Sequence, residues 1–237
     1  MNKVVKKTLL ILMLSADMIV CQSQVNTAES QQNLNALGGG SGMFRSFDNR
    51  YKGIQGGLML QENFVSGKIQ MSKGQLVKHE RINYDAYNDE LVVLMKDDRE
   101  AVVNTLMVIN FVLNVGADTL HFSRLLRPDG KIGFFLKMSN SGNILFYKRV
   151  YKTLAEPSYK GAYSVGRDYA EFVPEQKYFF LEKGWQLKEF KNRKSFVEQF
   201  PDHEEALESF IKKEKIDFKN DDDLRRLFKY LNEIRGG

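Results

Sequence analysis

The densest group of side chains that could bind a ligand lies between Tyr84 and Glu90, in the segment YDAYNDE. Oxygen ligands at alternating positions suit calcium, but this segment lacks the glycine and the distal glutamate of an EF-hand loop. Asn and Asp also tolerate positive φ and favour tight turns between strands. The segment therefore predicts a hairpin turn with solvated carboxylates, and calcium binding is the alternative.

Residues suited to nucleophilic or metal chemistry are few. The three histidines, His79, His121 and His203, are far apart in the sequence, and none has a second ligand at a spacing such as H-x-x-x-H. The sequence contains no G-x-S-x-G segment, and its single cysteine, Cys21, lies near the N-terminus. We therefore expect no catalytic residue, no metal site and no cofactor, and we predict that the protein is not an enzyme.

Two groups of side chains are candidates for contact with a partner. Tyrosines lie in and beside a predicted long loop, and aromatic loops on a rigid sheet often bind other molecules. A basic cluster precedes the first predicted helix and could contact an anionic surface. Tyrosines half buried against the sheet and a solvated strand end are the structural alternatives. The candidates are Tyr159, Tyr163, Tyr169, Lys191, Arg193 and Lys194.

The N-terminal segment has the pattern of a bacterial secretory signal peptide. Lys3, Lys6 and Lys7 precede an apolar stretch over residues 8–20. This stretch is about thirteen residues long, whereas a membrane-spanning helix needs roughly twenty. We predict export and cleavage before Gln24, with no transmembrane span in the mature chain.

Cys21 leaves a second outcome open at this terminus. A lipoprotein signal keeps a cysteine at its cleavage site, and that cysteine receives a lipid anchor. Such sites need a small residue just before the cysteine, and Val20 occupies that position. The sequence favours soluble release, and lipidation of Cys21 with retention at a membrane is the alternative.

Composition limits the mature chain to a globular domain. Removing residues 1–23 leaves about 214 residues with a net charge of about +3, which is a weaker excess than nucleic-acid binding proteins carry. The chain contains 10 Tyr and 17 Phe, which favours a packed core. Residues 24–43 are rich in Gln, Asn, Ser and Gly, which predicts a flexible tether.

Between residues 64 and 190, short β-favouring runs alternate with turn residues. The clearest run, 101–113, predicts a single strand in which Ile109, Phe111 and Leu113 share one buried face. The other predicted strands are 65–71, 76–84, 91–95, 119–125, 132–138, 144–151, 177–181 and 186–190, with a long loop over 154–167. Such spacing predicts an antiparallel meander of about eight to ten strands, strongly curved.

The hydrophobic period changes near the C-terminus. Ser195 and Glu198 form an S-x-x-E capping box, and Pro201 permits a second helix start. Asn220, followed by three aspartates, is a typical N-cap for a third helix. The sequence therefore predicts an α+β fold in which two or three short C-terminal helices pack on the sheet. The expected boundaries are 1–23 for the signal peptide, 24–43 for the tether and 44–237 for one domain, with strands over about 64–190 and helices over about 195–234.

Three segments carry a resemblance to a known group. The segments YDAYNDELVVL (Tyr84–Leu94), GIQGGLMLQENFVSGKI (Gly53–Ile69) and the helical stretch that begins KSFVEQF at Lys194 are similar to a widespread group of uncharacterised exported proteins of Bacteroidota. The resemblance implies the same compartment and architecture, and it carries no assigned activity or catalytic residue.

These observations predict a non-catalytic binding or accessory protein of the cell envelope. Its expected location is the periplasm or the outer membrane surface, and its expected partner is an envelope protein or lipid. The alternative is a periplasmic carrier in which a curved sheet encloses a lipid or another apolar ligand. The many phenylalanines motivate the carrier hypothesis, although a filled core explains them equally well.

Overall fold

A computed structural model describes residues 42–139, 141–158, 167–182 and 186–236. They lie in one compact unit, Gly40–Gly237. The strands are β1 (Phe44–Ser46), β2 (Val65–Met71), β3 (Leu76–Asp85), β4 (Glu90–Leu94), β5 (Glu100–Val103), β6 (Val108–Val115), β7 (Asp118–Leu126), β8 (Ile132–Lys137), β9 (Leu145–Ala155), β10 (Glu171–Leu181) and β11 (Leu187–Phe190). The helices are η1 (Thr105–Met107), α2 (Arg193–Val197), η2 (Pro201–His203), α3 (Glu204–Glu214) and α4 (Asp221–Ile234).

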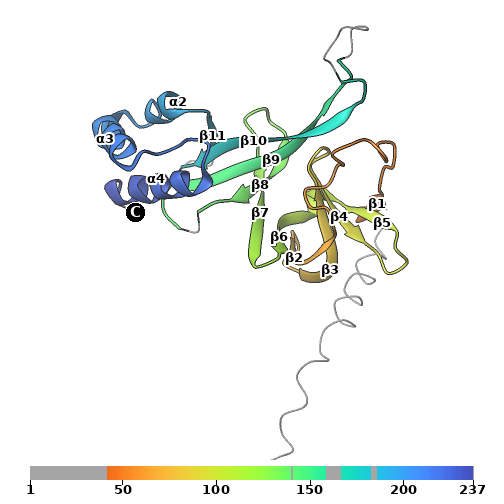
Figure 1. The fold of residues 1–237 in the computed structure, drawn as a ribbon. Helices are drawn as coiled ribbons and strands as arrows, with labels where there is room; N and C mark the ends of the chain where they lie inside the picture. The colour runs from red at the N-terminus through yellow and green to blue at the C-terminus, as the bar shows by residue number, and fades with distance from the viewer. Residues whose placement is uncertain (1–41, 140, 159–166, 183–185, 237) are drawn as a thin grey trace, which may run out of the picture. The chain divides into compact units, whose positions relative to one another are not determined.

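All strands of the described residues belong to one antiparallel sheet of 11 strands, in the order β1-β5-β4-β3-β2-β6-β7-β8-β9-β10-β11. The α helices follow the last strand, so the predicted α+β class with a meander and C-terminal helices is confirmed (Figure 1). The signal peptide, Cys21 and all but the end of the predicted tether lie outside the described residues. Met43, at that end, is buried and accepts a backbone hydrogen bond from Asn104, so the folded part includes it.

The first half of the sheet curls tightly around an aromatic core. Strand β3 pairs with β2 along most of its length and with β4 only from Ile82 onward. The curl brings Tyr84 of β3 within 5.1 Å of Phe122 on β7 and 6.3 Å of Phe134 on β8, measured between ring centroids. Two or more strands separate these residues in the sheet, so contact between them requires strong curvature. The predicted curvature is therefore confirmed.

The predicted single strand over 101–113 is wrong. Strand β5 ends at Val103, and the Asn104 side chain accepts a hydrogen bond from the Leu106 N–H to begin η1. Strand β6 then starts at Val108, and the register with β2 shifts so that Ile109 has no partner residue on that strand. This β-bulge turns Ile109 out to solvent. Alternation alone could not reveal the break, because a polar cap and a bulge interrupt the strand without changing its apolar composition.

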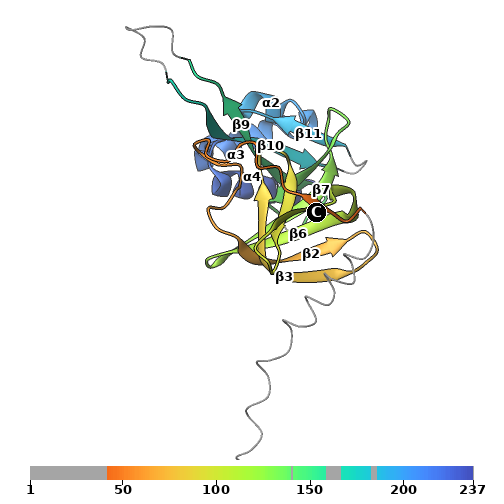
Figure 2. The same cartoon turned by 90° about the vertical axis from the view of Figure 1, so that its right-hand side faces the viewer.

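The second half of the sheet carries the helices on one face. Residues of β9, β10 and β11 form a cluster with α2, α3 and α4, and the ring of Phe146 stacks on that of Phe228 at 4.4 Å. The first residue of α4, Asp221, accepts hydrogen bonds from Lys148 Nζ at 2.9 Å and from the Tyr178 hydroxyl at 2.8 Å. Helix packing here is therefore supported by an aromatic core and by the charged contact of Asp221. Figure 2 shows the helices gathered behind β9 and β10.

The hairpin of β9 and β10 extends beyond its neighbours in the sheet (Figures 1 and 2). Strand β8 pairs with β9 only at Tyr147 and Lys148, and β11 pairs with β10 only from Tyr178 onward. Strand β10 begins at Glu171, well before the predicted start at residue 177, because β9 pairs with residues 171–176 although Pro174 and the lack of alternation disfavour a strand there. The centre of the predicted 154–167 loop, residues 159–166, lies outside the described residues.

The helix starts follow local capping, with one correction. Asn220 caps α4 as predicted, because its side chain accepts hydrogen bonds from the N–H groups of Asp222 and Asp223. The capping box of α2 instead joins Asn192 to Ser195, so the predicted box between Ser195 and Glu198 is wrong. Asn192 accepts from the Ser195 N–H, which starts the helix one turn earlier than Ser195 could. In the part of the chain that the structure describes, no helix is both long and apolar enough to span a membrane.

Candidate functional site

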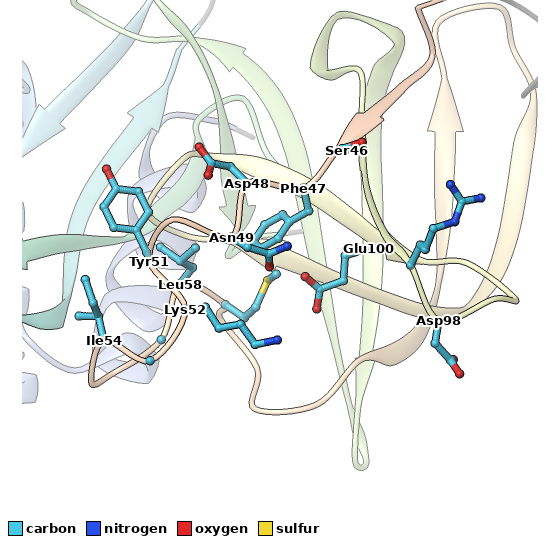
Figure 3. Close-up of a pocket in the computed structure, with 14 residues that line it drawn as sticks. Ser46, Phe47, Asp48, Asn49, Tyr51, Lys52, Ile54, Leu58, Asp98 and Glu100 are labelled. Carbon is cyan, nitrogen blue, oxygen red and sulfur yellow. The ribbon is translucent and has the colours of Figure 1, made fainter.

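An open groove lies between the loop that follows β1 and the turn that joins β4 to β5. It has a volume of about 530 Å³ (Figure 3). Backbone and side chains of 46–59 form one wall, and residues 98–100 form the other. The residues that line it are Ser46, Phe47, Asp48, Asn49, Tyr51, Lys52, Gly53, Ile54, Gly57, Leu58, Met59, Asp98, Arg99 and Glu100.

Charged and amide groups meet in the middle of this groove. The side-chain ends of Asn49, Lys52 and Glu100 lie in the same part of it, whereas Asp98 lies at one end (Figure 3). Asp98 is already paired with Arg81 at 2.6 Å. Among the described residues, neither Lys52 nor Glu100 belongs to an ion pair. The groove thus offers an ammonium group, a carboxylate and an amide that a polar ligand can engage.

Asn83 holds the loop that forms the larger wall. This fully buried side chain accepts hydrogen bonds from the N–H groups of Gln61 at 3.2 Å and Tyr84 at 2.8 Å. Its amide donates to the carbonyl oxygens of Gln61 at 2.8 Å and Asn63 at 3.2 Å. Both polar atoms of the Asn83 side chain are therefore hydrogen-bonded. Through them the end of the loop is attached to β3, in the way that a neighbouring strand would be.

Lys152 of β9 holds the middle of the same loop. Its ammonium group donates to the carbonyl oxygens of Gly56 at 2.7 Å, Gly57 at 3.0 Å and Met59 at 2.8 Å. Burial lowers the pKa of Lys152, and the negative charge of Asp85 opposes that shift. Three carbonyl dipoles around one ammonium group fix the loop against the β9–β10 hairpin.

Gly56 allows the loop to approach β10 this closely. A Cβ at Gly56 would lie 2.2 Å from the carbonyl oxygen of Phe172, and the φ of Gly56 is +79°. The Phe172 N–H donates to the carbonyl of Gln55 at 2.9 Å, and the Phe172 ring packs edge-on against Tyr51 at 5.6 Å. Only glycine combines this backbone conformation with this contact.

The acidic segment after β3 forms the predicted hairpin turn, and Asp89 has the positive φ expected of it, 62°. The expectation that its acids are solvated is wrong for Asp85, which is 0% exposed. Asp85 accepts hydrogen bonds from the N–H groups of Tyr87 at 3.0 Å and Asn88 at 2.9 Å, and from the Asn88 amide at 2.8 Å. The carboxylate thus accepts hydrogen bonds from backbone N–H groups of the turn that pair with no strand, which is a structural role.

Asp89 links this turn to the other half of the sheet. Its carboxylate accepts hydrogen bonds from the Tyr84 hydroxyl at 2.7 Å and the Phe134 N–H at 3.0 Å, and it lies 3.5 Å from Arg149. Burial, and then the charge of Asp89, raises the pKa of Tyr84 well above its usual value. A Cβ at Gly133 would lie 2.7 Å from the Asp89 carboxylate, so this contact also depends on a glycine.

The candidates taken from the sequence lie elsewhere and apart from one another. Tyr159 and Tyr163 fall outside the described residues. Tyr169 is exposed just before β10, whereas Lys191 follows β11, which pairs with the opposite end of β10. The structure therefore does not join the aromatic and basic groups into one surface.

The basic cluster is largely matched by acids. Arg193 pairs with Glu208, and Lys194 lies 3.9 Å from Glu198. Arg193 and Lys194 line a shallow depression near α2 and α3 together with Glu204 and both of these glutamates. The surface has mixed charge, so it does not present the purely cationic face that the sequence indicated.

Sequence reasoning missed the residues of the groove. Asn49, Lys52 and Glu100 are single polar residues in loops and at a strand start, and no spacing rule connects them. Gly53, Gly56 and Gly57 are residues typical of a loop, but glycines do not indicate what a loop faces. Within the described ranges, no three His, Cys, Asp or Glu side chains gather as a metal ion would require. Comparisons with models of known protein families, with curated proteins and with solved structures gave no match.

Proposed function

We propose that this chain is a non-catalytic binding protein of the cell envelope whose groove receives a polar partner. The partner class is an exposed segment of an envelope protein, because Lys52 and Glu100 can pair with side chains of both signs and Asn49 can bond a peptide group. The proposal includes export to the periplasm or the outer membrane surface, in line with the N-terminal pattern and the resemblance to exported proteins of Bacteroidota.

The observation that carries the proposal is a fixed loop beside two charged groups, Lys52 and Glu100. Among the described residues, neither group forms an ion pair. Asn83 and Lys152 hold that loop through six hydrogen bonds, so the groove is formed before any partner arrives. A preformed site avoids the entropy cost of ordering a loop during binding.

Two further observations support binding over the alternatives. Among the hydrogen bonds of the described residues, none joins a histidine to a hydroxyl or a carboxylate, the arrangement that a nucleophile and base would need. The phenylalanines that motivated the carrier hypothesis pack against one another, as Phe111, Phe122 and Phe134 do. The carrier hypothesis stays a prediction that co-purification of a lipid would support.

Affinity purification from the source cells with charge-reversal variants tests the proposal. Lys52→Glu should abolish recovery of the partner, whereas Lys68→Glu, at an exposed lysine of β2 remote from the groove, should not change it. The double swap Lys52→Glu with Glu100→Lys should restore part of the recovery if the partner contacts both groups. Recovery of no reproducible partner, or equal recovery with Lys52→Glu, would contradict the proposal.

A further inference from the structure

Four aliphatic side chains form an exposed apolar patch at one end of β6, β7 and β8. Leu106 is 65% exposed, Leu126 62%, Ile132 42% and Ile109 40%. They are four of the six large hydrophobic residues that are exposed in the described part of the chain, so these residues are concentrated and not scattered. Contiguous exposed apolar surface of this kind marks an interaction site.

Backbone contacts place the members of the patch next to one another. Leu126 and Ile132 are directly opposite partners across β7 and β8. Asn110 pairs with Ser123, so the preceding Ile109 lies beside Arg124. The Arg124 guanidinium donates to the carbonyl oxygens of Thr105, at 3.0 Å, and Leu106. Arg124 thus joins the segment of Leu106 and Ile109 to the strand that ends at Leu126.

The bulge in β6 creates part of this surface. Regular alternation would place Ile109 on the buried side with Phe111. Gln70 and Met71 of β2 instead pair with Asn110 and Val108, so Ile109 is the extra residue between them and its side chain turns outward. The bulge thus re-aims the Ile109 side chain, as bulges beside functional surfaces often do.

The segments that carry or adjoin the patch are cationic. Residues 72–75, 104–109 and 124–132 hold four cationic residues and one acid. The Ser72 N–H donates to the Met107 carbonyl at 2.8 Å, which brings the first of these segments beside η1. The acid, Asp129, is already paired with Arg127. The charged residues are Lys73, Arg124, Arg127, Asp129 and Lys131.

We propose that the apolar patch and its cations dock onto a lipid bilayer that contains anionic headgroups. Exposed aliphatic side chains beside Lys and Arg are the combination by which peripheral proteins bind such surfaces. A protein partner would be expected to meet aromatic anchors in a pocket, but the patch contains no aromatic residue and none of its members lines the groove. The docking surface is therefore separate from the groove and does not rest on the proposed function.

Sedimentation with lipid vesicles tests the inference. The chain should start at Gln24, because this form keeps the compact unit Gly40–Gly237 and omits the apolar stretch 8–20 and Cys21, which could bind lipid themselves. The probes are vesicles of phosphatidylcholine alone and vesicles with about 30% phosphatidylglycerol. We expect binding to the anionic vesicles, weakened several-fold when salt rises from about 50 to about 500 mM.

Substitutions distinguish the patch from general stickiness. The double variant Leu106→Asn/Leu126→Asn should lower vesicle binding at least about tenfold. Tyr169→Asn, which replaces a 40% exposed tyrosine just before β10 and in none of the three segments, should leave vesicle binding unchanged. Circular dichroism and thermal unfolding check that each variant folds, and Leu106→Phe, which keeps the apolar surface, should retain binding.

Three results would overturn the inference. The first is no binding of the folded chain to either vesicle. The second is equal binding by the double variant and the unmodified chain. The third is a concentration-dependent dimer that the double variant abolishes, without vesicle binding, since the patch would then serve a second copy of the chain.

Discussion

Lys152 provides the sharpest test of how the groove is built. Lys152→Met keeps the aliphatic length of the side chain but removes the donor to the Gly56, Gly57 and Met59 carbonyl oxygens. Gly56 and Gly57 are exposed, so their carbonyl oxygens can bond water instead and the loss of these two hydrogen bonds costs little. Met59 is half buried, so the hydrogen bond to its carbonyl oxygen accounts for most of the cost. Hydrogen bonds to a charged donor contribute roughly 1.5–3 kcal/mol where water cannot replace them, so we expect a loss of about 2 kcal/mol in total.

The loss should be local to the loop, because its aromatic contacts are those of Tyr51 with Tyr87 and Phe172 and do not involve the rings around Tyr84. Hydrogen exchange at the Leu60 and Phe172 amides, which donate to Tyr84 and Gln55, should accelerate roughly thirtyfold for a 2 kcal/mol loss. Exchange at the Leu224 amide in α4 should not change. Lys177→Met is the matched control, since Lys177 lies in the exposed part of β10 and its pair with Glu189 is 3.5 Å long. Less than twofold acceleration in Lys152→Met, or equal acceleration in Lys177→Met, would refute the reasoning.

Three other predictions follow from the contacts described above. Tyr84 has a folded-state pKa above its unfolded value, so its contribution to stability is fully present below pH about 10 and is lost as pH rises through the folded pKa. In urea unfolding between neutral and alkaline pH, Tyr84→Phe should therefore lose less free energy of unfolding than the unmodified chain. Equal losses would contradict this. Gly56→Ala should destabilise the fold by about 2–4 kcal/mol in thermal or urea unfolding, because it adds a backbone clash to a strained φ. The control is Gly74→Ala, which should cost only about 1 kcal/mol, because Gly74 has a similar φ of +83° but no neighbour within 4 Å. Equal costs would show that the clash at Gly56 is relieved. Phe228→Ala should lower the free energy of unfolding by about 3–5 kcal/mol, because it empties the centre of the helix–sheet core, where the Phe228 ring stacks on Phe146. A loss below about 1 kcal/mol would mean that this core collapses around the gap.

Much of the fold could be predicted from local patterns. The bounds of β2 follow from alternation between apolar and polar residues, which reports one buried face directly. The start of β8 follows from the turn residues Pro128, Asp129 and Gly130 that precede it. The start of α4 follows from Asn220, since an N-cap acts on the next two or three residues and needs no distant partner. Most pairs of consecutive strands also follow from short turns, which favour such neighbours. The pairs of β1 with β5 and of β2 with β6 join strands that are not consecutive, and no local pattern indicates them.

The early part of β10 and the break before β6 could not be predicted, because each depends on a partner strand. Residues 171–176 contain Pro174 and do not alternate between apolar and polar, and they become a strand only because β9 extends alongside them. Asn104 ends β5 and caps η1 in a run that reads as continuous strand. The bulge at Ile109 exists only in the register that β6 adopts against β2.

The candidate site shows the same division. The sequence by itself determined the turn chemistry of the YDAYNDE segment and placed glycines in the loop after β1, because these are properties of single residues and their immediate neighbours. Only the tertiary structure decided that Asp85 and Asn83 are buried, that Lys152 reaches Gly56 nearly a hundred residues away, and that Lys52 faces the same groove as Glu100. The physical reason is that burial, ion pairing and groove formation depend on the curl of the whole sheet, which no local spacing encodes.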